Sequence, residues 1–345
     1  MLRKPCITIF TTFALAIALL WPSGAIAQPP QTTAKQPLAT AEQSKTTADL
    51  QNVAELAKRL KKHVLVLSQD FHSRDRLHLE NQAKCVKYIA DHFKKAGGEV
   101  SYQDVKYRGH NYKNVIARFG KKGGKRFIIG GHYDAVPGAP GADDNASAVA
   151  AVIELAYMLG EKAKAGELKM DFEVVSYPLE ENGMIGSTAH ASLLKSQEVD
   201  VAGAVAFDMI GYFSDKPNSQ DYPLESMKKE YPTTGNFIAV IGRSDQKEFV
   251  DKFGKSMAEY KGIKTLYLAA PMVMPDIWRS DHASYWFFGW NGLLITDTAN
   301  LRNKAYHTPN DTADRLNFEK MAHVVLATWK VMGELPLKED AKSEK

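Results

Sequence analysis

Residues 126–159 read RFIIGGHYDAVPGAPGADDNASAVAAVIELAYML, and this stretch decides the fold. Phe127-Ile128-Ile129 lacks polar alternation, which predicts a strand buried on both faces. A glycine-rich loop follows it. The apolar residues Val149, Val152, Ile153 and Ala156 then recur at helical spacing and predict a helix over 145–159. A strand, a loop and a helix in succession are the repeating unit of an α/β protein.

The same alternation continues on both sides of this stretch. Amphipathic patterns predict helices over 53–67, 76–96, 246–260, 281–288 and 318–335. Further strands are predicted over 100–105, 114–119, 170–177, 201–207, 237–241, 265–269 and 292–296. Residues 201–207 and 293–295 are again apolar throughout, so we expect a sheet covered by helices on both faces. In such sheets ligands bind beyond the carboxyl ends of the strands.

The first 27 residues have the pattern of a signal peptide. Arg3 and Lys4 precede an apolar run over 7–21, and Ala25-Ile26-Ala27 supplies the small residues of a cleavage site. A retained membrane anchor is the alternative, but the run is short of the about 20 residues that span a bilayer. We therefore expect an exported protein, periplasmic or secreted, without stable membrane contact after cleavage.

The rest of the chain divides by composition. Residues 28–50 are rich in Thr, Ala, Gln, Lys and Pro and predict a low-complexity tether, residues 51–337 a single catalytic domain, and residues 338–345 a charged tail. The formal charge is only +4 over 345 residues, with scattered lysines, so we expect no nucleic-acid partner. Cleavage would leave Cys85 as the single cysteine, in helical register with Ile89 and Phe93, which predicts a buried thiol.

Polar residues follow the strand at 126–130 immediately. Alternation in an extended chain places Asp134 on the same side as His132, and a metal-bound histidine commonly gives its second ring N–H to a carboxylate. The loop then runs into the helix through Asp143, Asp144 and Asn145. One of these three is expected to cap the helix. An aspartate in a loop so rich in glycine is also placed to bridge two metal ions with its two oxygens.

Three further groups lie past other strand ends. Glu180 and Glu181 follow Pro178, which breaks the strand ladder, so both carboxylates can turn toward one site, one to bind metal and the other to carry a proton. Asp208 directly follows strand 201–207, and His307 lies in the loop after strand 292–296. Because all of these groups follow the ends of strands, we expect them to converge on one site. Two histidines and three carboxylates without a thiolate suit zinc in a hydrolytic site.

These residues resemble the zinc aminopeptidases typified by the bacterial leucyl aminopeptidase and aminopeptidase Y. The likeness runs from about residue 83 to the closing helix. It is carried by the segments GGHYDAVP, GADDNASAVA, EENGMIGS, AFDMIGY, RSDHASYWFFG and AYHTPNDT. It implies a three-layer α/β/α fold with a mixed, mostly parallel sheet of about eight strands.

The resemblance also implies a role for each residue. His132 and Asp208 would bind one Zn²⁺, Glu181 and His307 a second, and Asp144 would bridge the two ions. Glu180 would be the general base and Asp134 the hydrogen-bond partner of His132. The implied activity is hydrolysis of the N-terminal peptide bond, with a zinc-bridged water, on peptides with a free N-terminus.

The chain departs from some relatives in having no protease-associated insert domain. Residues 213–236, a polar stretch with three prolines, are expected to form a rim that shapes specificity. The side-chain pocket is predicted from four residues: Tyr306, Trp278, Trp286 and Arg279. Core packing is an equally good interpretation of the two tryptophans. Asp281 and His282 match a segment of the family but are expected at a helix start rather than as ligands.

Two alternative activities share this scaffold. A glutaminyl cyclase uses the same fold with one zinc, but the residue before His307 is Tyr306 rather than the tryptophan that we associate with cyclases. A carboxypeptidase or dipeptidase would need a cation for the terminal carboxylate, and Arg279 or Arg302 could supply it. A binding protein without activity is the least favoured interpretation, because such relatives lose ligands and none is missing here.

Overall fold

A computed structural model describes residues 47–120 and 123–337. The predicted signal peptide, the tether up to residue 46 and the tail at 338–345 lie outside the described residues. Helix α1 (Thr47–Leu65) begins within the stretch predicted as tether. All described residues belong to one compact unit, which agrees with the single domain expected. None of the helices in these two ranges has both the length and the apolar character that crossing a bilayer requires.

One eight-stranded sheet forms the centre of this unit, in the order β1-β2-β4-β3-β5-β8-β6-β7. Its strands are β1 (Glu99–Tyr107), β2 (His110–Phe119), β3 (Arg126–His132), β4 (Asp171–Tyr177), β5 (Val201–Phe207), β6 (Phe237–Arg243), β7 (Lys264–Ala270) and β8 (Gly292–Thr296). Each corresponds to a predicted strand. The four central strands β4, β3, β5 and β8 are mutually parallel, whereas β2 and β6 run antiparallel to their neighbours β4 and β8. The mixed sheet is therefore confirmed, and the carboxyl ends of the central strands meet at one edge.

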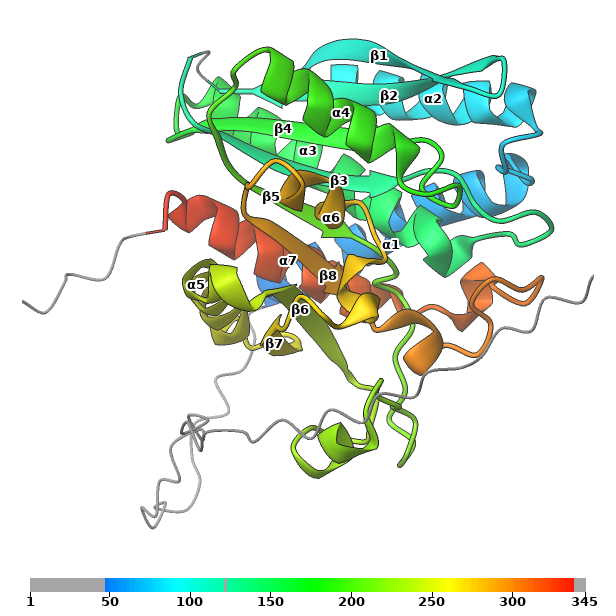
Figure 1. Cartoon of the computed structure of the whole chain (residues 1–345), viewed down its shortest axis with the longest axis vertical. Helices are drawn as coiled ribbons and strands as arrows, with labels where there is room; N and C mark the ends of the chain where they lie inside the picture. Colours follow the sequence, from blue (N-terminus) through cyan, green and yellow to red (C-terminus); the bar gives the residue numbers. More distant parts are fainter. Residues whose placement is uncertain (1–46, 121–122, 338–345) are drawn as a thin grey trace, which may run out of the picture. The chain divides into compact units, whose positions relative to one another are not determined.

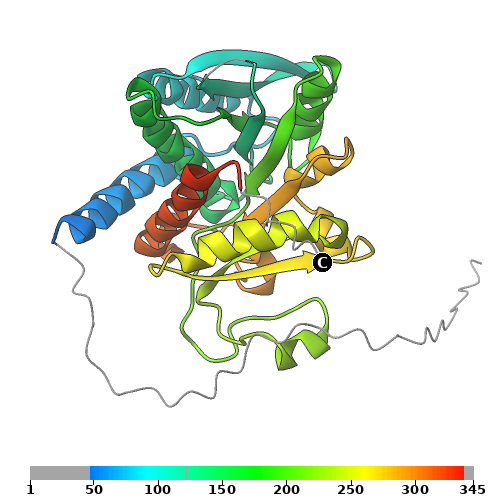
Figure 2. The same cartoon turned by 90° about the vertical axis from the view of Figure 1, so that its left-hand side faces the viewer.

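Helices cover both faces of the sheet, so the domain has three layers with the sheet in the middle (Figure 1). The larger layer contains α1, α2 (Leu79–Lys95), α3 (Ala148–Lys164), α5 (Lys247–Glu259) and α7 (Phe318–Glu334). The opposite face carries α4 (Ile185–Ser196) and α6 (His282–Trp286). Figure 2 shows α5 and α7 side by side on the larger layer, with the segment between β5 and β6 looping away from the sheet.

Strand β3 shows why an apolar run predicted burial on both faces. Phe127 and Ile129 pack into the large core with α3, while Ile128, between them, packs with Tyr285 of α6 on the other face. All three side chains are buried. Burial of an aliphatic side chain of this size contributes about 1.5–3 kcal/mol. Cys85 is buried in the larger core, as predicted.

Two helices differ from the prediction. Helix α4 was missed, because Gly186, Ser187 and Thr188 in its first turn are weak helix formers and give little pattern. Helix α3 starts at Ala148 rather than at residue 145. Asp144 (φ −104°, ψ 89°) and Asn145 (φ −136°, ψ 38°) have non-helical backbone. These two residues belong to the candidate site instead of the helix.

Candidate metal centre

The five predicted ligands converge at the edge where the central strands end. His132 is the last residue of β3, and Asp208 directly follows β5. Glu181 lies in the loop after β4, His307 in the loop after β8, and Asp144 between β3 and α3. They form two groups, each able to hold a metal ion: an inner group of His132, Asp144 and Asp208, and an outer group of Asp144, Glu181 and His307.

The distances within each group fit a shared cation. In the inner group, Nε2 of His132 lies 3.4 Å from Oδ1 of Asp144 and 3.9 Å from Oδ1 of Asp208. In the outer group, Nε2 of His307 lies 3.1 Å from Oδ2 of Asp144 and 3.1 Å from Oε2 of Glu181. Ligands of a tetrahedral zinc ion stand about 2.0–2.2 Å from the metal, so about 3.3–3.6 Å from one another. The two oxygens of Asp144 therefore face different groups.

Two buried polar atoms also fit a site for a cation. Nε2 of His132 and Oε1 of Glu181 are buried, and neither makes a hydrogen bond to any part of the chain that the structure describes. An unpaired buried polar atom costs about 1–3 kcal/mol, so such atoms normally have a partner. Imidazole and carboxylate donors without a thiolate suit zinc, and the residues present thus fit the metal that the sequence predicts.

The electrostatics of the site favour positive charge. Burial lowers the pKa of His132, but the carboxylates of Glu180, Asp134, Asp144 and Asp208 outweigh it and hold that pKa well above its usual range. Burial also lowers the pKa of His307, but Asp144 and Glu181 outweigh this effect and raise the pKa to about 10. Carboxylates outnumber imidazoles, so the site retains an excess of negative charge that metal cations would neutralise.

Glu180, the predicted base, lies beside the inner group without belonging to either group. Its Oε2 is 3.8 Å from Nε2 of His132, and its side chain is 11% exposed. Burial raises the pKa of Glu180 well above its usual range, and Asp208, Asp281 and Glu181 add to the rise against the opposing effect of His132. A carboxylate with a raised pKa accepts a proton readily near neutral pH, which is what a general base must do.

Asp134 has a wider set of contacts than the sequence suggested. Its Oδ1 is 3.5 Å from Nδ1 of His132, and its backbone carbonyl, rather than the predicted carboxylate, is the closer partner of the same ring nitrogen at 3.1 Å. The carboxylate also accepts the backbone N–H groups of Glu180 at 3.1 Å and Glu181 at 3.3 Å. Asp134 therefore orients a histidine and both glutamates at once.

Asp311 and Arg74 shape the site but were not predicted. The carboxylate of Asp311 accepts the backbone N–H groups of Asp143 and Asp144, both at 3.0 Å, and so fixes the residue that the two groups share. Arg74 is buried and donates to the carbonyls of Pro140 at 2.6 Å and Gly141 at 2.7 Å in the same loop. Asp311 stands in the AYHTPNDT segment, which was a signal without an assigned role. Arg74 gave no signal at all.

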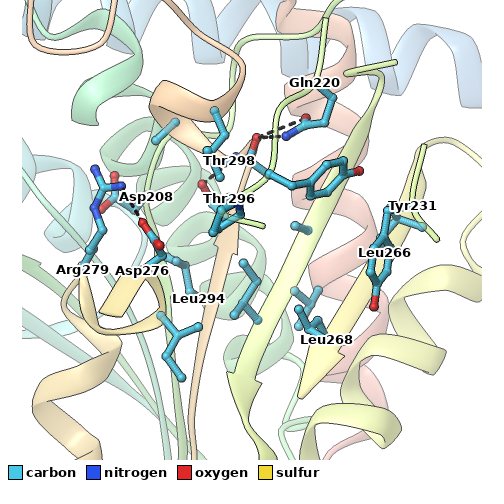
Figure 3. Close-up of a pocket in the computed structure, with 18 of the residues that line it drawn as sticks. Asp208, Gln220, Tyr231, Leu266, Leu268, Asp276, Arg279, Leu294, Thr296 and Thr298 are labelled. Carbon is cyan, nitrogen blue, oxygen red and sulfur yellow. Dashed lines mark hydrogen bonds and ion pairs between the residues drawn. The ribbon is translucent and has the colours of Figure 1, made fainter. Parts of the chain in front are cut away.

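An apolar cavity opens beside the inner group and is lined by residues of β8, β6 and β7 (Figure 3). It contains about 1020 Å³ of space free of protein atoms, part of it open to solvent. Asp208 lies toward one side of the cavity and Leu266 and Leu268 toward the other (Figure 3), and Tyr306 also lines it. Residues 213–236, which we call the rim segment, contribute Gln220, Tyr222, Pro223, Met227 and Tyr231 to its lining.

The four residues predicted for the substrate pocket divide into two pairs. Tyr306 and Arg279 line the cavity, and Arg279 donates to the hydroxyl of Tyr306 at 3.3 Å. Trp278 and Trp286 are not among its lining residues. Trp286 is buried in a small apolar cluster, and Trp278 packs against it edge to face, with ring centroids 5.1 Å apart. The structure thus places the tryptophans in the packing around the cavity, as the alternative interpretation expected.

Comparison with known proteins gives the family. Residues 114–332 match Peptidase family M28. The chain belongs to this family. It is 38% identical over 281 residues to the uncharacterized protein YfbL of Escherichia coli (strain K12), covering 78% of this chain and 85% of that protein. It is 28% identical over 221 residues to Leucine aminopeptidase 1 of Coccidioides posadasii (strain C735), covering 60% of this chain and 52% of that protein, so it spans about half the length of this relative.

Solved structures show the same fold at low identity. The LapA aminopeptidase of Legionella pneumophila matches with a TM-score of 0.64 and 20% identity, over 87% of this chain and 77% of that one. A glutaminyl cyclase of Porphyromonas gingivalis matches with a TM-score of 0.61 and 15% identity, over 81% and 98%. The M28 scaffold is therefore confirmed, and it carries both kinds of enzyme.

Membership of M28 confirms the predicted family and makes the chain a peptide hydrolase. Peptidases of this family depend on zinc, which agrees with the two candidate ligand groups.

Proposed function

We propose that this M28 peptidase is an exported two-zinc aminopeptidase that removes the N-terminal residue of peptides with a free amine. The observation that carries the proposal is a pair of ligand groups sharing Asp144 at the mouth of an apolar cavity. Leucine aminopeptidases among the sequence relatives support the same activity. Zinc ions held by the inner and outer groups would supply an acidified water and polarise the carbonyl of the scissile bond.

The side chains then divide the remaining work. Glu180 would take the proton of the attacking water and return it to the departing amine, because it lies beside the inner group and its pKa is raised by burial. Tyr306 stacks on the ring of His307, with centroids 3.7 Å apart. Its hydroxyl accepts from Arg279, and burial raises its pKa, so its own proton stays available for a substrate carbonyl.

The charge of the site supports recognition of a free amine. Asp208 belongs to the inner group and also lines the cavity, with 17% of its side chain exposed. An α-amine at this end of the cavity would lie beside the carboxylate of Asp208. The mainly apolar lining beyond it favours an apolar side chain on the N-terminal residue.

The hydrogen bonds of Arg302 and Arg279 argue against a carboxypeptidase. Arg302 is buried and donates to Gln220 and to the carbonyl of Phe237, both at 2.8 Å, so it is committed to the fold. Arg279 donates to Asn300 at 2.9 Å as well as to Tyr306. Neither is a free cation facing the metal centre.

Export remains a proposal from the sequence. The pattern over residues 1–27 supports it, and the mass of the mature protein tests it, since cleavage after Ala27 would leave Gln28 as the first residue. A mature protein that begins at Met1 would contradict the proposal.

A panel of substrates with and without a chelator tests the activity. We expect hydrolysis of leucinamide, at least about 100-fold slower hydrolysis of N-acetyl-leucinamide, and loss of both with chelator until zinc is restored. Equal rates on the free and blocked amides would overturn the aminopeptidase proposal. A peptide with N-terminal glutamine separates the cyclase, because cyclisation loses ammonia without cutting the chain.

A further inference from the structure

Gln220 is buried inside the rim segment, with 1% of its surface exposed. Its Nε2 donates to Oγ1 of Thr298 at 2.9 Å, and its Oε1 accepts from Nε of Arg302 at 2.8 Å (Figure 3 shows the pair with Thr298). Its backbone N–H donates to the carbonyl of Thr233, across the rim segment. One residue therefore ties this segment to itself through its backbone and to the turn at residues 298–302 through its side chain.

Arg302 extends the same connection to both ends of the rim segment. Its Nη1 donates to the carbonyl of Tyr212, which precedes the segment, at 3.3 Å and to that of Phe237, which follows it, at 2.8 Å. The segment has other attachments: Phe213 packs against the large core, the backbone N–H of Asp221 donates to the carbonyl of Leu301 at 2.8 Å, and ion pairs join Asp221 to Lys304 at 3.2 Å and Asp215 to Lys320 at 3.5 Å. Exposed ion pairs contribute little, so among the polar side-chain contacts the buried ones of Gln220 contribute more.

The turn at 298–302 also leads into the outer group. Asn303 follows it directly and donates to Oδ2 of Asp143 at 2.9 Å, beside the bridging residue. Tyr306 and His307 come next. The wall of the cavity and the outer metal ligand are thus anchored in the same short stretch of chain.

We propose that Gln220 is a positioning residue that determines specificity: it holds the rim segment as a fixed wall of the cavity and so sets the selection of bulky apolar N-terminal residues. The inference rests on the proposed aminopeptidase function. Without Gln220, the Nε donor of Arg302 would be left unpaired in a buried position. The loss of such a contact shifts a local equilibrium by about 5- to 100-fold, here toward a detached rim segment.

The test compares Gln220→Ala with Gln220→Glu, Thr298→Val and a matched control. Glu keeps an acceptor for Arg302, and Val keeps the shape of Thr298 while losing its hydroxyl. The control is Gln246→Ala, because Gln246 is half-buried and also makes two long-range hydrogen bonds, to the carbonyl of Trp290 at 2.8 Å and the N–H of Gly292 at 3.3 Å, at the other end of β8.

We expect Gln220→Ala to lower the ratio of kcat/KM for leucinamide over alaninamide by about tenfold, because the small alanine side chain does not reach the wall. Thr298→Val should lower the ratio less, Gln220→Glu should restore most of it, and Gln246→Ala should leave it unchanged. Equal losses on both amides would mean a purely structural role and would overturn the proposal.

Hydrogen exchange separates this inference from the proposed function. Gln220→Ala should speed the exchange of backbone amides in residues 213–236, whereas Gln246→Ala should not. Unchanged exchange in the rim segment would overturn the role of Gln220 whether or not the protein is active. A wild-type enzyme that hydrolyses neither amide would instead count against the aminopeptidase, with the exchange result still deciding the inference.

Discussion

The inner and outer groups share Asp144, but they are built from different parts of the fold. The inner ligands His132 and Asp208 stand at the ends of the parallel strands β3 and β5, and the side chain of His132 is 1% exposed. The outer ligands Glu181 and His307 stand in loops, and the side chain of His307 is 36% exposed. One group is fixed by the sheet and the other by contacts between loops.

This difference shows how a peptidase site can be both rigid and open. The strand ladder fixes the backbone at the ends of β3 and β5, and the ring of His132 is also held by the backbone carbonyl of Asp134. The outer group depends on hydrogen bonds from elsewhere: Asp134 holds the amide of Glu181, and Asp311 holds that of Asp144. His307 itself has a left-handed backbone with φ of 58°, which costs about 1–2 kcal/mol and persists only when its surroundings impose it.

The largest expected effect comes from a residue that belongs to neither group. Glu180→Gln should leave the ligands of both groups in place, because it removes a charge without changing the shape of the side chain. We expect both metal sites to fill while kcat falls by about 100- to 10,000-fold, the usual contribution of a general base. Metal analysis and steady-state kinetics on the same preparation measure both quantities. A near-normal kcat would show that the base lies elsewhere.

The second prediction tests the comparison directly by removing one histidine from each group. His132→Ala leaves a buried gap among carboxylates and should cost about 1–3 kcal/mol of stability together with the inner metal. His307→Ala should lose the outer metal with a smaller loss of stability than His132→Ala, since its side chain is 36% exposed and its ion pairs are screened by solvent. Metal content and chemical unfolding of the two variants decide it. If both variants unfold at the same denaturant concentration, the groups are not held differently.

The sequence predicted those parts of the molecule whose position follows from the pattern of strands. All eight strands were predicted, and so was the convergence of the five ligands, because residues at the ends of parallel strands must meet at one edge. The division of Glu180 and Glu181 into base and ligand came from the family resemblance. In a loop, adjacent side chains do not alternate between two fixed sides as they do in a strand. The sequence pattern alone therefore does not tell which of the two glutamates is the base.

The contacts that hold the loops could not be predicted from the sequence. Asp311 and Arg74 act on backbone groups, Asp311 on the N–H of Asp144 and Arg74 on the carbonyl of Gly141. A backbone partner leaves no residue pattern to detect. Gln220 is a comparable case, because its partners Thr298 and Arg302 come near only after β6 and β8 pair in the sheet.

The smallest expected effect is the release of a proton from His307 when zinc binds to the outer group. Without metal, Asp144 and Glu181 hold the pKa of His307 at about 10, so at pH 7 the ring carries a proton. Zinc needs the neutral ring, and binding must therefore release that proton, making outer-site affinity rise by about tenfold for each pH unit up to about pH 10. The stability of the metal-free protein follows the opposite course. A raised pKa contributes stability that is fully present below about pH 6.5 and is lost as the pH rises through about 10.

Calorimetric titration of zinc in buffers of different ionisation enthalpy counts the released protons. We expect His307→Ala to release about one proton fewer per chain than the wild type at pH 7. The control is His110→Ala, since His110 is exposed at the start of β2, far along the chain from both groups. It should release as many protons as the wild type. If His307→Ala releases as many as the control, His307 is already neutral before zinc arrives, and the ion pairs with Asp144 and Glu181 do not form in the metal-free protein. The outer group would then be open before binding, and its contrast with the inner group would lie in exposure alone.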